Sequence, residues 1–136
     1  MSEENKSIIS RTYDAINRQD LDALAAVIAD DVIEHDEFPG LEQSKSGVLQ
    51  FFRNLHAAFS GLTMTVEDLI GEGDRVFVRA TLSGTHRGEF LGVPATGRSI
   101  SVPMADFFRI RDGRVVEHWG VADSGVMMQQ LGVGAP

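Results

Sequence analysis

The chain has 136 residues, of which 43% are apolar, and both values are typical of one folded domain rather than of a disordered segment. Its formal net charge is −8, and because nucleic acids are bound mainly through Lys and Arg, we expect no nucleic-acid partner. The absence of cysteine excludes disulfides, thiolate metal sites and cysteine nucleophiles. The polar start does not resemble a signal peptide, and no apolar run reaches the roughly 18 residues of a membrane span. We therefore predict a cytoplasmic protein without a membrane partner, folded as a single domain over residues 1–136.

The first third of the chain carries helical spacing. Ile9, Tyr13 and Ile16 lie four and three residues apart, which predicts a helix over Glu4–Arg18. Asp20 is suited to cap a second short helix. The apolar positions of that second helix are Leu21, Leu24, Ala25 and Ile28.

A short strand and a third helix follow. The strand is predicted at Val32–His35, and a loop at Phe38-Pro39-Gly40 comes after it. The third helix is predicted to begin at Ser46. Its apolar face is the clearest in the sequence and consists of Val48, Phe51, Phe52, Leu55 and Phe59. Three large aromatic side chains on one face need a broad apolar cover, and we expect a sheet to provide it.

After Gly61 the apolar period changes from that of a helix to that of a strand. Residues 62–66 and 76–82 alternate about a turn at 71–74, and a loop rich in Gly and Pro occupies 87–98. Two further strands are predicted at Ser99–Ile110 and Arg114–Val121. A last helix, capped by Asp123, is expected around Gly125–Leu131. Helices first and strands afterwards predict the α+β class with an antiparallel sheet.

A carboxylate interrupts the apolar face of the strand Ser99–Ile110. Its other even positions are apolar, so Asp106 is predicted to point inward, where burial raises the pKa of a carboxyl unless a partner compensates. A two-residue turn at 112–113 would turn Glu117 inward, which is costly. A three-residue turn at 111–113 would place Asp106 opposite His118 and turn Glu117 outward. We therefore predict the three-residue turn and an inward Asp106–His118 pair.

An Asp–His pair is able to move protons, because histidine titrates near neutrality and the carboxylate orients its ring. The alternative interpretation is a buried ion pair with only a structural role. Tyr13 is predicted to reach the same cavity with its hydroxyl, and either His35 or Asp36 to point inward. His56 and His86 are expected at the surface. The apolar residues predicted to shape the pocket are Phe51, Phe90, Leu91, Val93, Met104 and Met127.

Several other chemistries lack their motif. The sequence has no G-x-S-x-G elbow, no phosphate-binding loop and no dinucleotide fingerprint. No two histidines have the spacing of metal ligands on one helix or strand, so we expect no metal. An epoxide hydrolase would need an Asp–Arg–Asp arrangement, of which Arg79 and Asp106 supply only part. The remaining groups suit acid/base chemistry without a cofactor.

The run Gly84–Gly97, GTHRGEFLGVPATG, resembles the loop of the SnoaL-like polyketide cyclase family. Phe108-Arg109-Ile110, Val116-Glu117-His118-Trp119 and Gln129-Gln130-Leu131-Gly132 are similar to that family as well. The wider superfamily includes nuclear transport factor 2 and ketosteroid isomerase. The resemblance implies a conical α+β barrel, in which N-terminal helices pack on a curved antiparallel sheet and enclose a deep apolar cavity. It also implies a homodimer or homotetramer, and the strand pattern leaves Phe107, Trp119 and Val121 on an outer face that a second copy would cover.

The resemblance further implies an aldol ring closure, in which an aspartate two residues after the histidine acts as acid/base. His118 matches that histidine, but the aspartate position is Gly120 here, and a carboxylate stands across the strand pair at Asp106. We predict that Asp106 and His118 are catalytic, and that Tyr13, His35, Phe51, Phe90 and Met104 contact a small apolar carbonyl compound. The alternative is a non-catalytic ligand-binding or dimerisation module.

Overall fold

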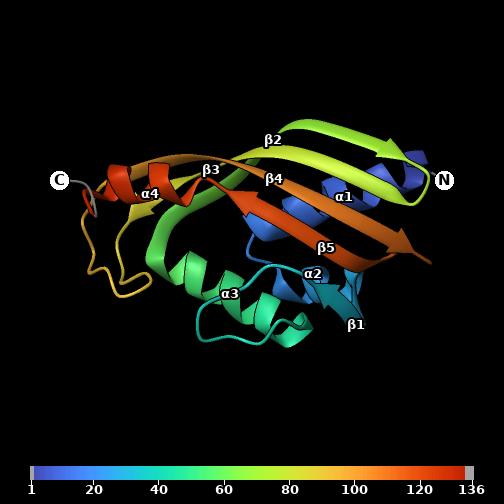
Figure 1. Cartoon of the computed structure of the whole chain (residues 1–136), viewed down its shortest axis with the longest axis horizontal. Coiled ribbons are helices and arrows are strands. Elements are labelled where there is room, and N and C mark those ends of the chain that lie inside the picture. The colour runs from blue at the N-terminus through green and yellow to red at the C-terminus, as the bar shows by residue number, and fades with distance from the viewer. Residues whose placement is uncertain (1, 134–136) are drawn as a thin grey trace.

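A computed structural model describes residues 2–133, which form four helices and five strands (Figure 1). In chain order the elements are α1 (Ser2–Asn17), α2 (Leu21–Val27), β1 (Ile28–Glu34), α3 (Lys45–Ala58), β2 (Phe59–Glu72), β3 (Arg75–His86), β4 (Ser99–Arg111), β5 (Arg114–Ala122) and α4 (Ser124–Leu131). The predicted α+β class is confirmed. No helix within residues 2–133 is long and apolar enough to cross a membrane.

Side-chain caps fix where three of the helices begin. Asp20 accepts a hydrogen bond from the Ala23 N–H, and Asp123 accepts one from the Val126 N–H, as predicted. Ser44 caps α3, so this helix begins one residue earlier than expected. It ends at Ala58, and Phe59 already belongs to β2.

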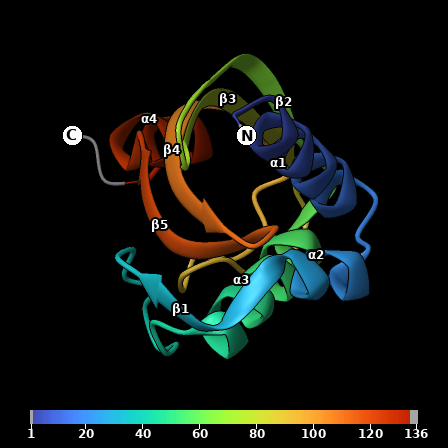
Figure 2. The same ribbon diagram turned by 90° about the vertical axis from the view of Figure 1, so that its right-hand side faces the viewer.

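The strand order is β1-β5-β4-β3-β2, and the sheet is curled without being closed. Neighbouring strands are antiparallel except for β1 and β5, which run parallel. The predicted antiparallel barrel is therefore corrected to an open sheet with one parallel pair. A parallel β1–β5 pair is possible because three other strands separate β1 from β5 in the sequence, so no hairpin joins them. In Figure 2 the helices α1, α2 and α3 lie over the open side of the curled sheet, and α4 packs on β4.

The turn between β4 and β5 differs from the prediction. Arg111 pairs with Arg114, so the turn has two residues, Asp112 and Gly113, and both have positive φ angles of 52° and 77°. These angles are those of the tight turns that join twisted antiparallel strands. The predicted three-residue turn is therefore wrong.

A bulge in β5 supplies the extra residue that the prediction assigned to the turn. Ile110 pairs with Val115 while Arg109 pairs with Glu117, so Val116 has no partner opposite it. Beyond this bulge the side chains alternate as predicted, with His118 inward and Glu117 on the other face. The register nevertheless differs from the prediction: each residue of β4 pairs with a residue further along β5, so Asp106 lies opposite Gly120 and not opposite His118.

The inward face of β4 is confirmed, since Ile100, Val102, Phe108 and Ile110 are all buried in the core. On the outer face, the rings of Phe107 and Trp119 meet edge to face at 5.7 Å between centroids. Val121 beside them is 73% exposed. A second copy of the chain covering this face stays a prediction.

His86 is buried completely, so its expected place at the surface is wrong. The loop after β3 folds back over it, and the Thr96 N–H donates to Nδ1 of the ring at 3.2 Å. The Phe59 ring packs against its face. His56 is half-buried, with Nε2 2.8 Å from the carbonyl oxygen of Ile16.

We predict that Asn17→Ala lowers the free energy of unfolding by about 1–3 kcal/mol, because two buried backbone groups lose their partner. The Asn17 side chain accepts from the Met64 N–H at 2.7 Å and donates to the Met64 carbonyl oxygen at 3.0 Å, which holds the end of α1 on β2. Urea denaturation measures the change. Asn54→Ala, which removes an exposed contact with Gln50, is the control. Equal losses in the two variants would contradict this role for Asn17.

Candidate active site

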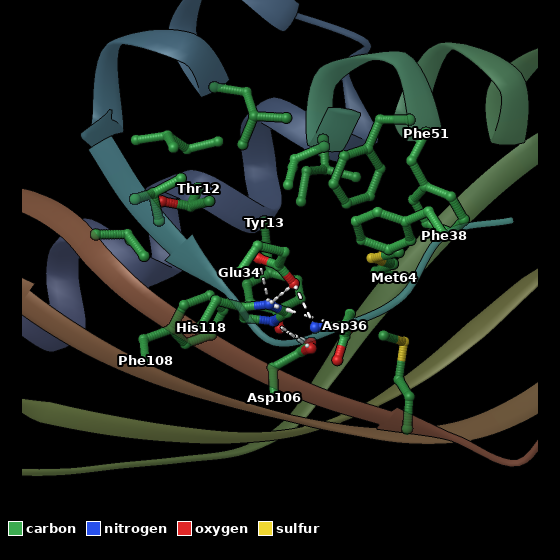
Figure 3. Close-up of a pocket in the computed structure, with 18 residues that line it drawn as sticks. Thr12, Tyr13, Glu34, Asp36, Phe38, Phe51, Met64, Asp106, Phe108 and His118 are labelled. Carbon is green, nitrogen blue, oxygen red and sulfur yellow. Dashed lines mark hydrogen bonds and ion pairs between the residues drawn. The ribbon is translucent and has the colours of Figure 1, made fainter. Parts of the chain in front are cut away.

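A pocket of about 100 Å³ lies between the concave face of the sheet and the helices (Figure 3). Its 18 lining residues are mostly apolar and come from α1, α2, α3, the loop after β1 and four of the strands. Five ionisable side chains meet at one wall: Tyr13, Glu34, Asp36, Asp106 and His118. A polar cluster inside an apolar pocket is the usual composition of a small-molecule site.

His118 stands at the centre of this cluster. Its Nε2 lies 2.9 Å from Oδ1 of Asp106, and its Nδ1 lies 2.7 Å from Oε1 of Glu34. The contact predicted between Asp106 and His118 is therefore present, although Asp106 lies directly opposite Gly120 and reaches His118 diagonally. Their catalytic role stays a prediction.

Both ring nitrogens of His118 face carboxylates, so the ring is an imidazolium that donates on both sides. Burial alone would lower the pKa of His118. The hydrogen bonds and negative charges of Asp106 and Glu34 outweigh burial and raise this pKa to about 10. His118 is consequently an acid and a positive charge at neutral pH.

Tyr13 extends the cluster from α1. Its hydroxyl donates a hydrogen bond to Oδ2 of Asp106. Burial, followed by the negative charge of Asp106 and this hydrogen bond, raises the pKa of Tyr13 far above its usual range. The hydroxyl therefore stays protonated, and a continuous chain runs from Tyr13 through Asp106 and His118 to Glu34.

Asp36, the residue two positions after Glu34, also points into the pocket. Its Oδ1 accepts a hydrogen bond from the Gly120 N–H at 2.8 Å, and its Oδ2 lies 4.0 Å from Nδ1 of His118. Burial raises the pKa of Asp36; the charge of His118 and the Gly120 hydrogen bond oppose this, and the charges of Glu34 and Asp106 add to it.

Two features of the backbone bring these groups together. The parallel pairing of β1 with β5 sets Glu34 beside His118. Gly120 leaves space for the acids, because a Cβ atom there would lie 2.4 Å from Oδ2 of Asp36 and 2.9 Å from Oδ1 of Asp106. Any side chain at this position would displace part of the cluster.

Three of the five residues predicted to contact substrate line the pocket, namely Tyr13, Phe51 and Met104. His35 lies outside it, with its ring stacked on Trp119 at 4.7 Å and its Nε2 2.6 Å from Glu117. Of the pair His35 and Asp36, it is Asp36 that points inward. Phe90 packs on the ring of Phe59 and borders a second groove. Leu91, Val93 and Met127 also lie outside the lining of the main pocket.

Sequence reasoning missed Glu34. The signal was present, because alternation along the predicted strand puts Glu34 on the same buried face as Val32. What the sequence did not show is that this strand pairs with β5, which gives the buried carboxylate its partner.

Glu34, Asp36 and His118 each offer one ligand atom, and these atoms lie within 4.8 Å of one another. A metal ion bound there would have to displace the proton that Nδ1 of His118 donates to Glu34. The imidazolium already provides these carboxylates with a positive charge.

Comparisons with known proteins agree with this architecture. The family model described as SnoaL-like polyketide cyclase matches residues 7–131. IdmH of Streptomyces antibioticus, a proposed polyketide cyclase, is 37% identical with a TM-score of 0.83, over 95% of this chain and 99% of that chain. AclR of Streptomyces galilaeus, a proposed hydroxylase, is 30% identical with a TM-score of 0.87, over 97% of this chain and 98% of that chain.

TsrD of Streptomyces laurentii is also 30% identical, with a TM-score of 0.88 over 97% of both chains. A search of curated proteins found no match. Cyclase and hydroxylase activities are both named among these similar structures, so the shared fold does not by itself select one reaction.

We predict that stability falls as the pH rises from about 6.5 toward 10. The pKa of His118 is about 10 in the folded chain and the ordinary value is 6.5. The imidazolium therefore contributes its full share to the free energy of unfolding below pH 6.5, and this contribution is lost as the pH rises to about 10. The difference in unfolding free energy between the wild type and His118→Gln should shrink by more than about 1 kcal/mol across this window. Urea denaturation at three pH values measures it, and a constant difference would contradict the buried imidazolium.

Proposed function

Because this chain belongs to the SnoaL-like polyketide cyclase family, we propose that it is a cofactor-independent acid/base enzyme that moves a proton next to the carbonyl group of a small apolar compound. The observation that carries this proposal is the chain Tyr13–Asp106–His118–Glu34 in the wall of an otherwise apolar pocket. Burying charged groups is costly, and such groups gather where chemistry needs them.

The cluster provides both halves of an enolisation. A carboxylate removes the proton from the carbon next to the carbonyl, and the C–H electron pair forms the double bond of the enolate. Negative charge then develops on the carbonyl oxygen, where the positive charge of His118 stabilises it. The Tyr13 hydroxyl, which donates to Asp106 in the free protein, would have to turn to the substrate to donate to this oxygen as well. The enolate carbon afterwards takes a proton back or attacks a second carbonyl, so no electrons leave the substrate and no redox cofactor is needed.

The pocket limits the substrate. An apolar cavity of about 150 Å³ holds one benzene molecule. This pocket has a volume of about 100 Å³, so a ligand of the size of benzene or larger has to displace lining side chains. The stacked rings of Phe38 and Phe51 form one side of the pocket, and the second groove lies beyond them. Three carboxylates against one imidazolium also disfavour a substrate with its own carboxylate. We therefore propose an uncharged ketone or a similar carbonyl compound.

One observation favours the alternative of a non-catalytic ligand-binding module. Both ring nitrogens of His118 and both carboxylate oxygens of Asp106 already have partners within the cluster. A cluster that satisfies itself in this way is also what a purely structural ion pair requires. The two functions differ in whether the pocket changes the protonation of a bound ketone.

We predict that the protein accelerates the exchange of protons for deuterium next to the carbonyl of a small ketone in D₂O. Proton magnetic resonance follows the exchange for acetone, cyclopentanone, cyclohexanone and acetophenone. His118→Gln and Asp106→Asn should slow it by about 100-fold or more, which is the usual contribution of a positioned acid or base. His35→Gln, which alters a ring outside the pocket, is the matched control and should stay within about twofold of the wild type. A ketone that binds without any exchange would establish the binding module instead.

A further inference from the structure

We propose that the groove beyond Phe38 and Phe51 is a second part of the substrate site, which binds the elongated apolar arm of a ketone whose carbonyl group lies at His118. This inference rests on the proposed function and names a class of substrate for it. The proposed function requires only a small carbonyl compound, whereas the groove favours one that carries a chain of several carbon atoms.

The pocket and the groove share a wall. Phe38 and Phe51 line both cavities, and their rings stack with 4.5 Å between the centroids. In Figure 3 both rings lie at the side of the pocket opposite Phe108. Phe38 is partly buried and belongs to the connection between β1 and α3, which contains neither helix nor strand. A rotation of this one side chain therefore joins the two cavities without moving a helix or a strand.

The volumes of the two cavities favour their joint use. The pocket has a volume of about 100 Å³ and the groove one of about 280 Å³. Sites for small molecules usually have about 300 Å³ or more. Neither cavity reaches this value alone, whereas the two together exceed it. A ketone with its carbonyl group at His118 fills the pocket with that group and its nearest carbons, so a longer chain has to continue into the groove.

The groove suits an apolar arm. Seven of its nine lining residues are apolar, and Asn54 and Glu89 are the other two. Oε1 of Glu89 already accepts a hydrogen bond from the Gly92 N–H at 2.8 Å. Because none of the nine lining side chains is positively charged, an anionic arm would find no partner among them. The lining therefore selects for hydrocarbon.

Two walls of the groove are fastened to each other. The carbonyl oxygen of Ala58, at the end of α3, accepts hydrogen bonds from the N–H groups of Arg87 and Gly88 at 2.8 and 3.0 Å. Gly88 lies so close to α3 that a Cβ atom there would be 2.8 Å from the Ala57 carbonyl oxygen. The loop 87–98 thus keeps a fixed distance from α3. A groove that exists before the ligand arrives spends little binding energy on ordering its walls.

Leu91 lines the groove in a backbone conformation that leucine rarely adopts. Its φ is 49° and that of Gly92 is 82°, while Phe90 and Val93 exchange two backbone hydrogen bonds across them at 3.0 and 2.9 Å. Tight turns with two positive φ angles favour Asn, Asp or Gly at the first of these positions. Leu91 is also 51% exposed. A strained, half-exposed leucine serves neither the turn nor the core, which supports a role toward a ligand.

The affinities of 2-butanone and 2-octanone test the second subsite. Both have the same carbonyl group, and 2-octanone has four more methylene groups. Because each methylene that leaves water for an apolar site raises the affinity about fourfold, and burial can be incomplete, we expect wild-type protein to bind 2-octanone at least about 30-fold more tightly. Titration followed in the amide nitrogen-15 spectrum measures both Kd values without relying on catalysis. A ratio below about fivefold would overturn the proposal.

Leu91→Asn tests the part played by this side chain. The ratio of the two affinities should fall by about fivefold or more, because the methylenes lose an apolar wall. The urea midpoint should not fall, because asparagine adopts a positive φ more readily than leucine. Ile70→Asn, which removes another exposed apolar side chain from β2, is the matched control and should keep the wild-type ratio. An unchanged ratio with a lower midpoint in Leu91→Asn would assign Leu91 to the fold and overturn the proposal.

Intermolecular nuclear Overhauser effects locate the arm directly. The terminal methyl group of 2-octanone should contact Phe90 and Leu91, and the methyl group next to the carbonyl should contact Tyr13. Contacts of the terminal methyl with Met64, which lines only the main pocket, would overturn the proposal. Loss of a dimer on sedimentation of Leu91→Asn, with an unchanged affinity ratio, would show that a second copy of the chain covers the groove, and would overturn it as well.

The outcomes separate this inference from the proposed function. A wild-type protein that exchanges the protons of a small ketone, but gains no affinity with chain length, would overturn the second subsite and leave the enzyme proposal intact. A wild-type protein that binds 2-octanone through the groove, but exchanges no ketone, would overturn the enzyme proposal and leave the subsite intact.

Discussion

The structure depends on one buried imidazolium held between two carboxylates. His118 on β5 bonds Asp106 on β4 and Glu34 on β1, and Asp106 in turn accepts a hydrogen bond from Tyr13 on α1. Helix α1 and strand β1, from the start of the chain, therefore meet the β4–β5 hairpin at this cluster. Removing either carboxylate would leave a buried charge without full compensation, which is far more costly than the net value of the intact pair. This constraint fixes the parallel β1–β5 edge, the inward direction of His118 and the need for a residue without a side chain at position 120.

Much of this arrangement could be predicted from alternation along single strands. The apolar even positions of β4 identified its inner face and placed Asp106 on it. The predicted length of the β4–β5 turn was wrong because the pattern of inward side chains does not reveal where the extra residue lies. One extra residue gives the same alternation in the turn or, as observed, at Val116 within β5. Alternation along β1 placed Glu34 on a buried face, but its partner His118 was missed because β5 returns beside β1 from elsewhere in the chain. The burial of His86 was missed because the loop that covers it follows β3, which no local pattern records.

The same geometry bears on how the chain differs from the cyclases that it resembles. The resemblance expects an aspartate at position 120, and the structure has a glycine there with the carboxylate of Asp36 against it. In the proposed account, a carboxylate is thus supplied to the same wall from the loop after β1.

The protonation state of His118 is the measurement that tests this account most directly. Nitrogen-15 magnetic resonance of the ring reports how many of its two nitrogens carry a proton. The account predicts that both nitrogens of His118 are protonated at neutral pH and stay so until the pH approaches about 10. A neutral ring with one protonated nitrogen at pH 7 would contradict it, because the pocket would then lack the positive charge on which the proposed chemistry depends.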